Sequence, residues 1–293
     1  GGGITVEPDC GYGEQADGLK YGFMDIDDKS TLKDGRFDGF SDDIITYLKK
    51  GKINGTSYVT ADYDKYDVET LSKFGEGVMP VRFSIGADAN AYYTVTVTVV
   101  NTSETDSTEI SLFSEKRHFI LYKHTLEAGE TITKTWNVNL VGQYYNSSGN
   151  YNDDAINIAV AGKNAGLVSV EIEKCENVGK TAWLLNDSTG DDVEASLPFF
   201  DLSSRGGVGQ AMAKYINPEI AICNHGEGGL KSSDTKHFDR VVENMRSGDY
   251  MFVQYGFNGE TTDSLKKNLP RYYNAAHEKG VKLVVVSTTE RHS

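Results

Sequence analysis

The sequence lacks any apolar run of the roughly 20 residues that a helix needs to cross a lipid bilayer. It is also short of basic residues, since 29 lysines and arginines stand against 43 aspartates and glutamates, for a formal net charge of −14. Nucleic-acid binding depends on Lys and Arg side chains that neutralise phosphates. We therefore expect neither a membrane-spanning protein nor a nucleic-acid-binding one.

Cysteine is scarce as well, with three residues whose spacing fits no metal-binding motif. Two interpretations stay open for Cys10 and Cys175, which flank the first half of the chain: a disulfide in an oxidising compartment, or free thiols. Cys223 lies in an apolar run and is predicted to be a buried thiol. These residues give no reason to expect a cofactor.

From about residue 90 the sequence has the period of two that is typical of a strand buried on one face. The segment YYTVTVTVV (92–100) alternates polar residues with β-branched ones. Four further segments, separated by polar turn sequences, show the same alternating pattern: 117–122, 131–138, 155–160 and 167–173. Several short strands separated by such turns predict a β-sandwich.

Residues 1–90 are rich in Gly, Asp and Tyr, and we expect them to add loops and a few strands to the same sandwich. Within them, MDIDDKSTLKDG (24–35) has oxygen ligands suited to a structural calcium ion. It lacks the spacing of a helix–loop–helix calcium site, so a solvated acidic turn is the favoured interpretation.

After Lys180 the pattern changes to short, almost continuous apolar runs, which are typical of parallel strands covered on both faces. They lie at 181–185, 219–223, 250–255 and 281–286. Strands that alternate with helices predict a three-layer α/β/α sheet with right-handed crossovers. The expected fold is therefore all-β followed by α/β, with domains at 1–176 and 180–293.

Two helices are predicted between these strands. TKHFDRVVENMR (235–246) places four apolar residues on one face. In the segment 270–280, Pro270 stands where a helix can begin and Gly280 where one can end.

Three polar motifs follow three successive predicted strands: NDST (186–189), NHGEGGLKS (224–232) and GFNG (256–259). The carboxyl ends of parallel strands meet at one edge of a sheet, where chemistry gathers. A nucleophilic serine there needs a base and hydrogen-bond donors for the developing oxyanion. Ser188 and Gly229 can each offer a backbone N–H and Asn258 its side-chain amide, so the ordered triple predicts acyl-transfer chemistry.

On these motifs the second half of the chain resembles the SGNH (GDSL-like) hydrolases, and most of all their rhamnogalacturonan acetylesterase branch. The similarity extends to GVGQAMAKYI (207–216), SGDYMFVQYGFN (247–258) and VVVSTTERHS (284–293). The first half is similar to the jelly-roll or galactose-binding-like sandwich that precedes some of these esterases, a candidate carbohydrate-binding domain.

The resemblance implies that Ser188 is the nucleophile and that Asp187 supports the elbow, the sharp turn after the first strand that carries Ser188. It also implies that Ser188, Gly229 and Asn258 form the oxyanion hole. Two positions depart from the family pattern. Asn186 replaces a glycine, and asparagine is among the residues that best tolerate the left-handed backbone in which the family has glycine, so we expect the turn to be kept. Gly259 replaces an aspartate, which removes an acceptor from the third loop.

A third departure concerns the base. The family places D-x-x-H after a fifth strand, and no such pair follows the fourth strand here. We expect an SGNH domain that is incomplete at its C-terminus, with the missing segment in a longer or separate chain; a degenerate member is the alternative. Asp234 and His237 do form a D-x-x-H, but a helix-capping Asp and a surface His are favoured there. His225 is predicted to be structural or substrate-facing.

The resemblance implies a secreted or cell-surface carbohydrate esterase, its leader already removed, that takes acetyl groups from rhamnogalacturonan, pectin or xylan. It implies no metal and no cofactor. The alternative is a non-catalytic carbohydrate-binding protein or a degenerate pseudoenzyme. The many tyrosines fit that alternative, because exposed aromatic rings can stack on sugars.

Overall fold

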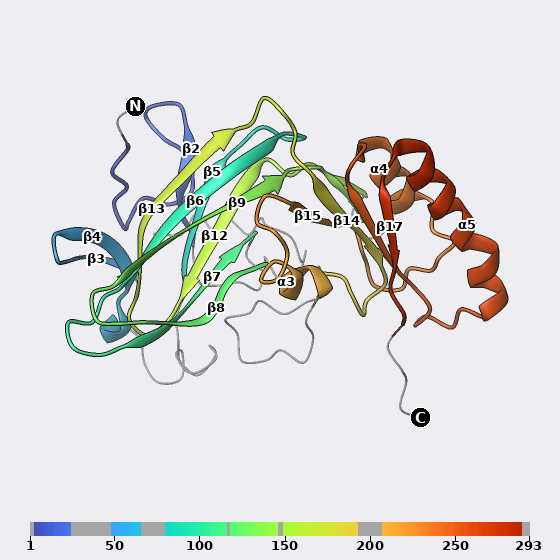
Figure 1. Cartoon of the computed structure of the whole chain (residues 1–293). Helices are drawn as coiled ribbons and strands as arrows, with labels where there is room; N and C mark the ends of the chain where they lie inside the picture. Colours follow the sequence, from blue (N-terminus) through green and yellow to red (C-terminus); the bar gives the residue numbers. More distant parts are fainter. Residues whose placement is uncertain are drawn as a thin grey trace.

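The computed structural model combines antiparallel β-sheets with a smaller α/β part (Figure 1). Its helices are few, and none within the described segments is both long and apolar enough to cross a membrane. The acidic segment predicted at 24–35 lies outside the described residues from position 25 onward. The structure describes residues 3–24, 48–65, 80–115, 118–145, 149–192 and 207–288.

The first large sheet is antiparallel and has six strands in the order β1-β2-β5-β12-β7-β8. Two of its strands come from the region before residue 80, as expected. Its strands are β1 (Gly13–Glu14), β2 (Lys20–Met24), β5 (Val81–Gly86), β12 (Ala155–Ala161), β7 (Thr108–Ser114) and β8 (His118–Leu126).

The second large sheet is also antiparallel, with five strands in the order β3-β4-β13-β6-β9. A single 3-10 turn, η1 (Tyr63–Lys65), follows β4. The strands are β3 (Leu48–Ile53), β4 (Thr56–Ala61), β13 (Ala165–Lys174), β6 (Tyr92–Asn101) and β9 (Thr131–Asn139).

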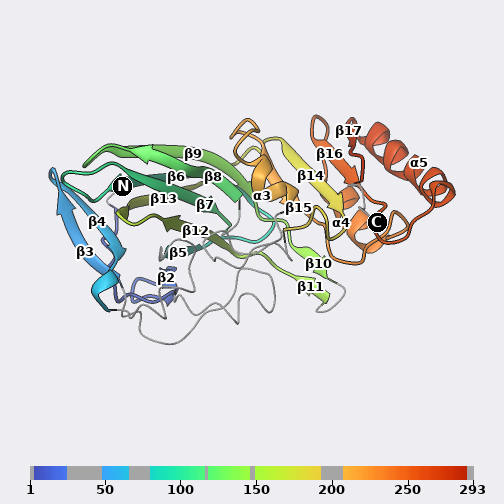
Figure 2. The same cartoon turned by 90° about the horizontal axis from the view of Figure 1, so that it is seen from below.

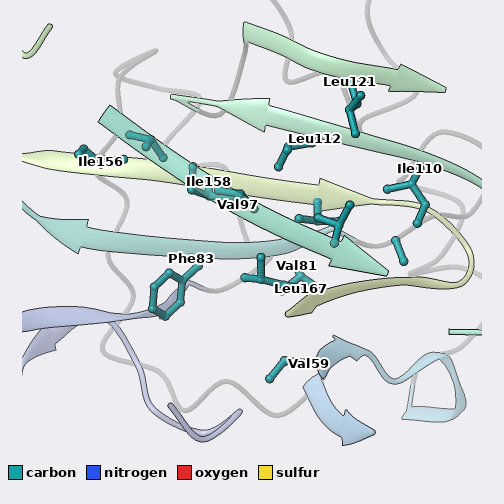
Figure 3. Packing of buried hydrophobic residues seen from close by; sticks show 14 of the residues in the cluster. Val59, Val81, Phe83, Val97, Ile110, Leu112, Leu121, Ile156, Ile158 and Leu167 are labelled. Atoms are coloured by element: carbon teal, nitrogen blue, oxygen red, sulfur yellow. The ribbon is translucent and has the colours of Figure 1, made fainter. Parts of the chain in front are cut away.

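The alternation in β6 explains how the two sheets pack. Val95, Val97 and Val99 are fully buried, while the intervening Thr96 and Thr98 bond across to threonines of β9 on the outer face. Burying every second side chain of a strand creates one apolar face, and two such faces form a sandwich core. Figure 3 shows side chains of both sheets meeting in that core.

A small hairpin leaves the sandwich and reaches the α/β part (Figure 2). It consists of β10 (Gln143–Tyr145) and β11 (Gly149–Tyr151). Arg240 donates to the Gly142 carbonyl and to Asn150 Oδ1, both at 2.8 Å, and Lys236 Nζ donates to Tyr144 Oη at 2.6 Å. The hairpin is thus bound to the helix that carries Lys236 and Arg240.

The α/β part is a parallel sheet in the order β15-β14-β16-β17. All four strands lie within or beside the predicted apolar runs, and β14 is buried along its whole length. The strands are β14 (Thr181–Asn186), β15 (Ala221–Asn224), β16 (Tyr250–Gln254) and β17 (Lys282–Val285), with the helices α3 (Val208–Met212), α4 (Lys236–Asn244) and α5 (Thr262–Lys279).

The predicted start of the last helix is wrong, because α5 begins at Thr262 and Pro270 lies inside it. Thr261 caps the helix by accepting a hydrogen bond from Ser264 N at 3.1 Å. A proline inside a helix removes one backbone hydrogen bond. Apolar residues before Pro270 pack against the core, and this packing offsets the lost bond, so the helix begins earlier than predicted. The predicted end is confirmed, since Gly280 takes the left-handed conformation with φ 69°.

The sandwich and the parallel sheet are joined by polar contacts along β9 and β15. Asn137 N donates to the Pro218 carbonyl at 2.8 Å. Tyr92 Oη donates to the carbonyls of Lys180 and Glu219, at 2.9 and 3.0 Å. These hydrogen bonds pair polar groups of the two parts where they meet.

The structure also decides between the two interpretations of the cysteines, because all three are free thiols. Cys223 is buried, as predicted, and donates to the Asn139 carbonyl. Burial raises the pKa of the Cys223 thiol well above its usual value.

Candidate active site

The three polar motifs leave the sheet at one edge. β14 pairs in parallel with β15 on one side and β16 on the other, with Leu184 opposite Asn224 and Asn186 opposite Gln254. The loops that follow these strands are therefore neighbours, as the sequence predicted. We call them the first loop (187–192), the second loop (225–234) and the third loop (255–261).

Two asparagines join the first and second loops. Asn186 Nδ2 donates to Asn224 Oδ1 at 3.0 Å, and Asn224 Nδ2 donates to the Gly190 carbonyl at 2.9 Å. Asn224 Oδ1 also accepts from Gly226 N at 3.1 Å. Both asparagines are buried, so these bonds fix the start of both loops in a region that water does not reach.

Asp187 joins the first loop to the third. Its carboxylate is fully buried; Oδ1 accepts from Thr189 N and Thr189 Oγ1 at 3.0 and 2.7 Å, and Oδ2 accepts from Phe257 N at 3.2 Å. The Asp187 carbonyl accepts from Gly190 N at 3.0 Å, which closes the turn that contains Ser188. Asp187 thus shapes the elbow on both sides of Ser188.

The second and third loops are linked by Asn258 and Glu260. Asn258 Nδ2 donates to the Leu230 carbonyl at 2.9 Å. The Glu260 carboxylate accepts from Ser232 N at 3.0 Å and from Ser232 Oγ. Sequence reasoning missed this pair; its only signal was an acidic residue next to the GFNG motif and a serine at the end of the second motif.

Hydrogen-bond donors remain free beside the serine. Ser188 is half-buried, and within the described residues neither its N–H nor its hydroxyl forms a hydrogen bond. The N–H of Gly229, an exposed residue with φ 80°, is likewise unbonded across the described segments. Asn258 Nδ2 uses one of its two hydrogens on Leu230, which leaves the other for a ligand. These are the three donors predicted for an oxyanion.

The two departures in the loops have structural explanations. Asn186 is the last residue of β14 and has no positive φ, so the elbow does not demand a left-handed residue there. Its side chain instead fills the space over Gly226, where an added methyl group would overlap Asn186 Oδ1. Gly259 has φ 71°, a conformation that glycine adopts more readily than aspartate.

The structure favours the structural interpretation of His225 over the substrate-facing one. Its side chain is 1% exposed, and its ring lies 5.6 Å from that of Trp183. Burial, reinforced by the nearby charges of His237 and Arg240, lowers the pKa of His225 to about 3. A neutral ring beneath the loops is out of reach of a ligand in this structure.

The expectation of a surface histidine at 237 is wrong. His237 is buried between two carboxylates: Nε2 lies 3.0 Å from Glu227 Oε2, and Nδ1 lies 3.1 Å from Asp234 Oδ2. Asp234 does cap α4, by accepting from His237 N at 3.0 Å. Burial would lower the pKa of His237, but the two carboxylates raise it to about 9. A ring held as a cation by two partners supports the second loop and is no base for Ser188.

A further pair, missed from the sequence, connects the sandwich to the first loop. His118 of β8 places its Nε2 3.0 Å from Asp192 Oδ2. Asp192 Oδ1 in turn accepts from Gln210 N of α3 at 3.0 Å. The partners are separated by 74 positions, so no local pattern could have shown the pair.

The remaining histidines add no base. His124 and His277 are exposed, and His292 lies outside the described residues. In the part of the chain that the structure describes, no group of three or more His, Cys, Asp or Glu side chains is arranged to hold a metal ion.

No family model and no curated protein matches this sequence. Among solved structures, the protein YXIM from Bacillus subtilis is 17% identical, with a TM-score of 0.37 over 98% of this chain and 70% of that one. A family two carbohydrate esterase from Cellvibrio japonicus is 8% identical, with a TM-score of 0.29 over 73% of this chain and 74% of that one.

An acetyl xylan esterase from the rumen bacterium Butyrivibrio proteoclasticus is 10% identical, with a TM-score of 0.26 over 93% of this chain and 90% of that one. Carbohydrate esterases therefore recur among the structures similar to this chain. TM-scores this low establish neither the fold nor the function of this chain, so its chemistry is inferred from the site itself.

Gly226→Ala is expected to destabilise the protein by about 2 kcal/mol or more, because the methyl group overlaps the Asn186 amide. In the Asn186→Gly background, Gly226→Ala should lower the free energy of unfolding clearly less, because the overlapping amide is gone. The measurement is a double-mutant cycle by urea denaturation, with Gly13→Ala as a control, since nothing lies within 4 Å of a methyl group there. Additive costs, or a Gly226→Ala as mild as the control, would contradict this packing.

His237 predicts a pH dependence of stability. Its pKa is raised in the folded state from 6.5 to about 9, so its contribution is fully present below pH 6.5 and is lost as pH rises through about 9. The difference in Tm between the wild type and His237→Gln should be largest below pH 6.5 and shrink above 9. The exposed His277→Gln should show no such trend. A difference that stays constant from pH 5 to 10 would argue against the buried ion pairs.

Proposed function

We propose that this protein is a serine carbohydrate esterase of the SGNH type that removes acetyl groups from a plant cell-wall polysaccharide, pectin or xylan. The observation that supports the proposal is that the loops bearing Ser188, Gly229 and Asn258 follow neighbouring strands and are bonded to one another by polar side chains. The free N–H groups of Ser188 and Gly229 and the Asn258 amide supply the donors that acyl transfer requires. A polysaccharide substrate implies a secreted or cell-surface location.

In the proposed reaction Ser188 Oγ attacks the acetyl carbonyl carbon and transfers its proton to a base. The three donors stabilise the oxyanion of the tetrahedral intermediate. The ester C–O bond then breaks, and the sugar oxygen leaves with the proton as a hydroxyl group. Water attacks the acetyl-enzyme in the second half of the reaction, which releases acetate and restores Ser188.

The proposal takes the base from outside the described residues. His237 has both ring nitrogens beside carboxylates, His225 is buried with a low pKa, and His118 is bonded to Asp192. The second candidate is a carbohydrate-binding protein without turnover. It is favoured by the Ser188 hydroxyl, which has no histidine partner among the residues that the structure describes.

Ser188→Ala separates the two candidates. We expect it to reduce acetate release from acetylated pectin or xylan by about 10³-fold or more, because it removes the atom that forms the acyl-enzyme. The control is Ser233→Ala, an exposed serine of the second loop, which should keep wild-type turnover. Acetate release that survives Ser188→Ala would exclude Ser188 as the nucleophile, and a wild type that binds polysaccharide without releasing acetate would favour the binding protein.

A further inference from the structure

A cavity of about 190 Å³ opens between the sandwich and the α/β part, and none of its described lining residues belongs to the three loops of the candidate active site. Its walls come from β8, from β9 and from the segment 213–222 that connects α3 to β15. Figure 1 shows α3 lying between the sandwich and the parallel sheet at this place. The cavity therefore exists only because the two parts are packed together.

One wall of the cavity is apolar and half-buried. Ile120 comes from the sandwich, and Ile216, Ile220 and Ile222 come from the α/β part. Two cationic side chains, Lys134 and Lys214, line the same space. A ligand that fits must combine an apolar face with negative charge.

Among the described residues, no carboxylate neutralises the two lysines. Elsewhere lysines of this acidic chain lie beside carboxylates, as Lys49 does with Asp62 at 2.9 Å. Neither Lys134 nor Lys214 contacts a carboxylate in the part of the chain that the structure describes. The Glu115 carboxylate also lines the cavity, but the two lysines outnumber it, so the described lining carries a net positive charge that suits an anion.

Other polar groups of the wall are already occupied. Trp136 Nε1 donates to Ser114 Oγ at 2.8 Å, and Asn137 Nδ2 donates to the Glu219 carbonyl at 3.0 Å. The Glu115 carboxylate accepts from Asn157 N and Nδ2, both at 3.3 Å. The ammonium groups are thus the charged donors left for a ligand.

Exposed aromatic rings lie beside Lys214. Its Nζ is 5.9 Å from the ring centroid of Tyr122 and 5.7 Å from that of Tyr215. Tyr215 is 80% exposed and Tyr122 40% exposed, which is unusual for rings of this size. Aromatic faces of this kind can pack against the apolar face of a sugar ring.

We propose that this cavity binds a uronate residue, whose carboxylate contacts Lys134 and Lys214. Its ring packs against the isoleucines of the wall and extends toward the two tyrosines beside Lys214, which do not themselves line the cavity. Resting on the esterase proposed above, this makes the substrate an acidic polysaccharide, with one of its uronates held in the cavity. His118 lines the cavity and bonds to Asp192 of the first loop, so the bound sugar lies next to the connection between the sandwich and the serine turn.

Calorimetric titration of Ser188→Ala protein tests the site without turnover, so its outcome is independent of whether the chain is an esterase. The probes are a free uronate monosaccharide, a uronate oligosaccharide, a neutral oligosaccharide of equal length and inorganic phosphate. We expect the two uronates to bind, the oligosaccharide more tightly if the site takes a chain and equally if it takes a single sugar. The neutral oligosaccharide and phosphate should bind at least about tenfold more weakly. The neutral sugar lacks the carboxylate that contacts the lysines, and phosphate lacks the ring that packs against the apolar wall.

The variants Lys134→Ala and Lys214→Ala should each weaken uronate binding, and together by about tenfold or more. Lys163→Ala, an exposed lysine elsewhere on the sandwich, should leave it unchanged. Tyr215→Ala removes a largely exposed ring without disturbing the core and should weaken uronate binding but not phosphate binding. Equal affinity for neutral and acidic sugars, equal affinity for phosphate, no binding of either uronate, or no loss in the lysine variants would overturn the proposal.

Discussion

Buried polar side chains at the carboxyl end of β14 hold the candidate site together. Asn186 and Asn224 join the first loop to the second, and Asp187 joins it to the third. The Asn186 and Asn224 amide groups and the Asp187 carboxylate that form these bonds would be costly to bury unpaired, so the bonds favour this arrangement of the loops. Among the described residues, the same arrangement leaves the N–H groups of Ser188 and Gly229 without hydrogen-bond partners, which is what a site for an oxyanion needs.

The sandwich takes part in this architecture and is more than an appended support. β9 runs beside β15, the β10–β11 hairpin is bonded to α4, and His118 contacts Asp192 just after the serine turn. Each contact comes from a different strand of the sandwich, so the position of the sheet is fixed from several sides. Hydrogen bonds are directional, so these contacts define how the two parts are oriented more closely than an apolar interface would.

The sequence predicted what local pattern controls, namely the strand segments, the β plus α/β fold and the meeting of three motifs at one sheet edge. It failed where tertiary contacts decide. The start of α5 depends on core packing ahead of Pro270, and the burial of His237 depends on Glu227 from another loop. His118 and Asp192 are distant in sequence, and Glu260 gave almost no signal before its bonds to Ser232 were seen.

The central claim is that Ser188 is the nucleophile, with the oxyanion donors supplied by the three loops and the base supplied by residues outside those that the structure describes. Its most direct test is labelling of the native protein with a serine-directed organophosphate, followed by intact-mass measurement and mapping of the tryptic peptide 181–205. The account predicts one adduct per chain, on Ser188, in the folded protein and none after denaturation, because activation requires the assembled site. An unlabelled native protein, or an adduct on another residue, would contradict it.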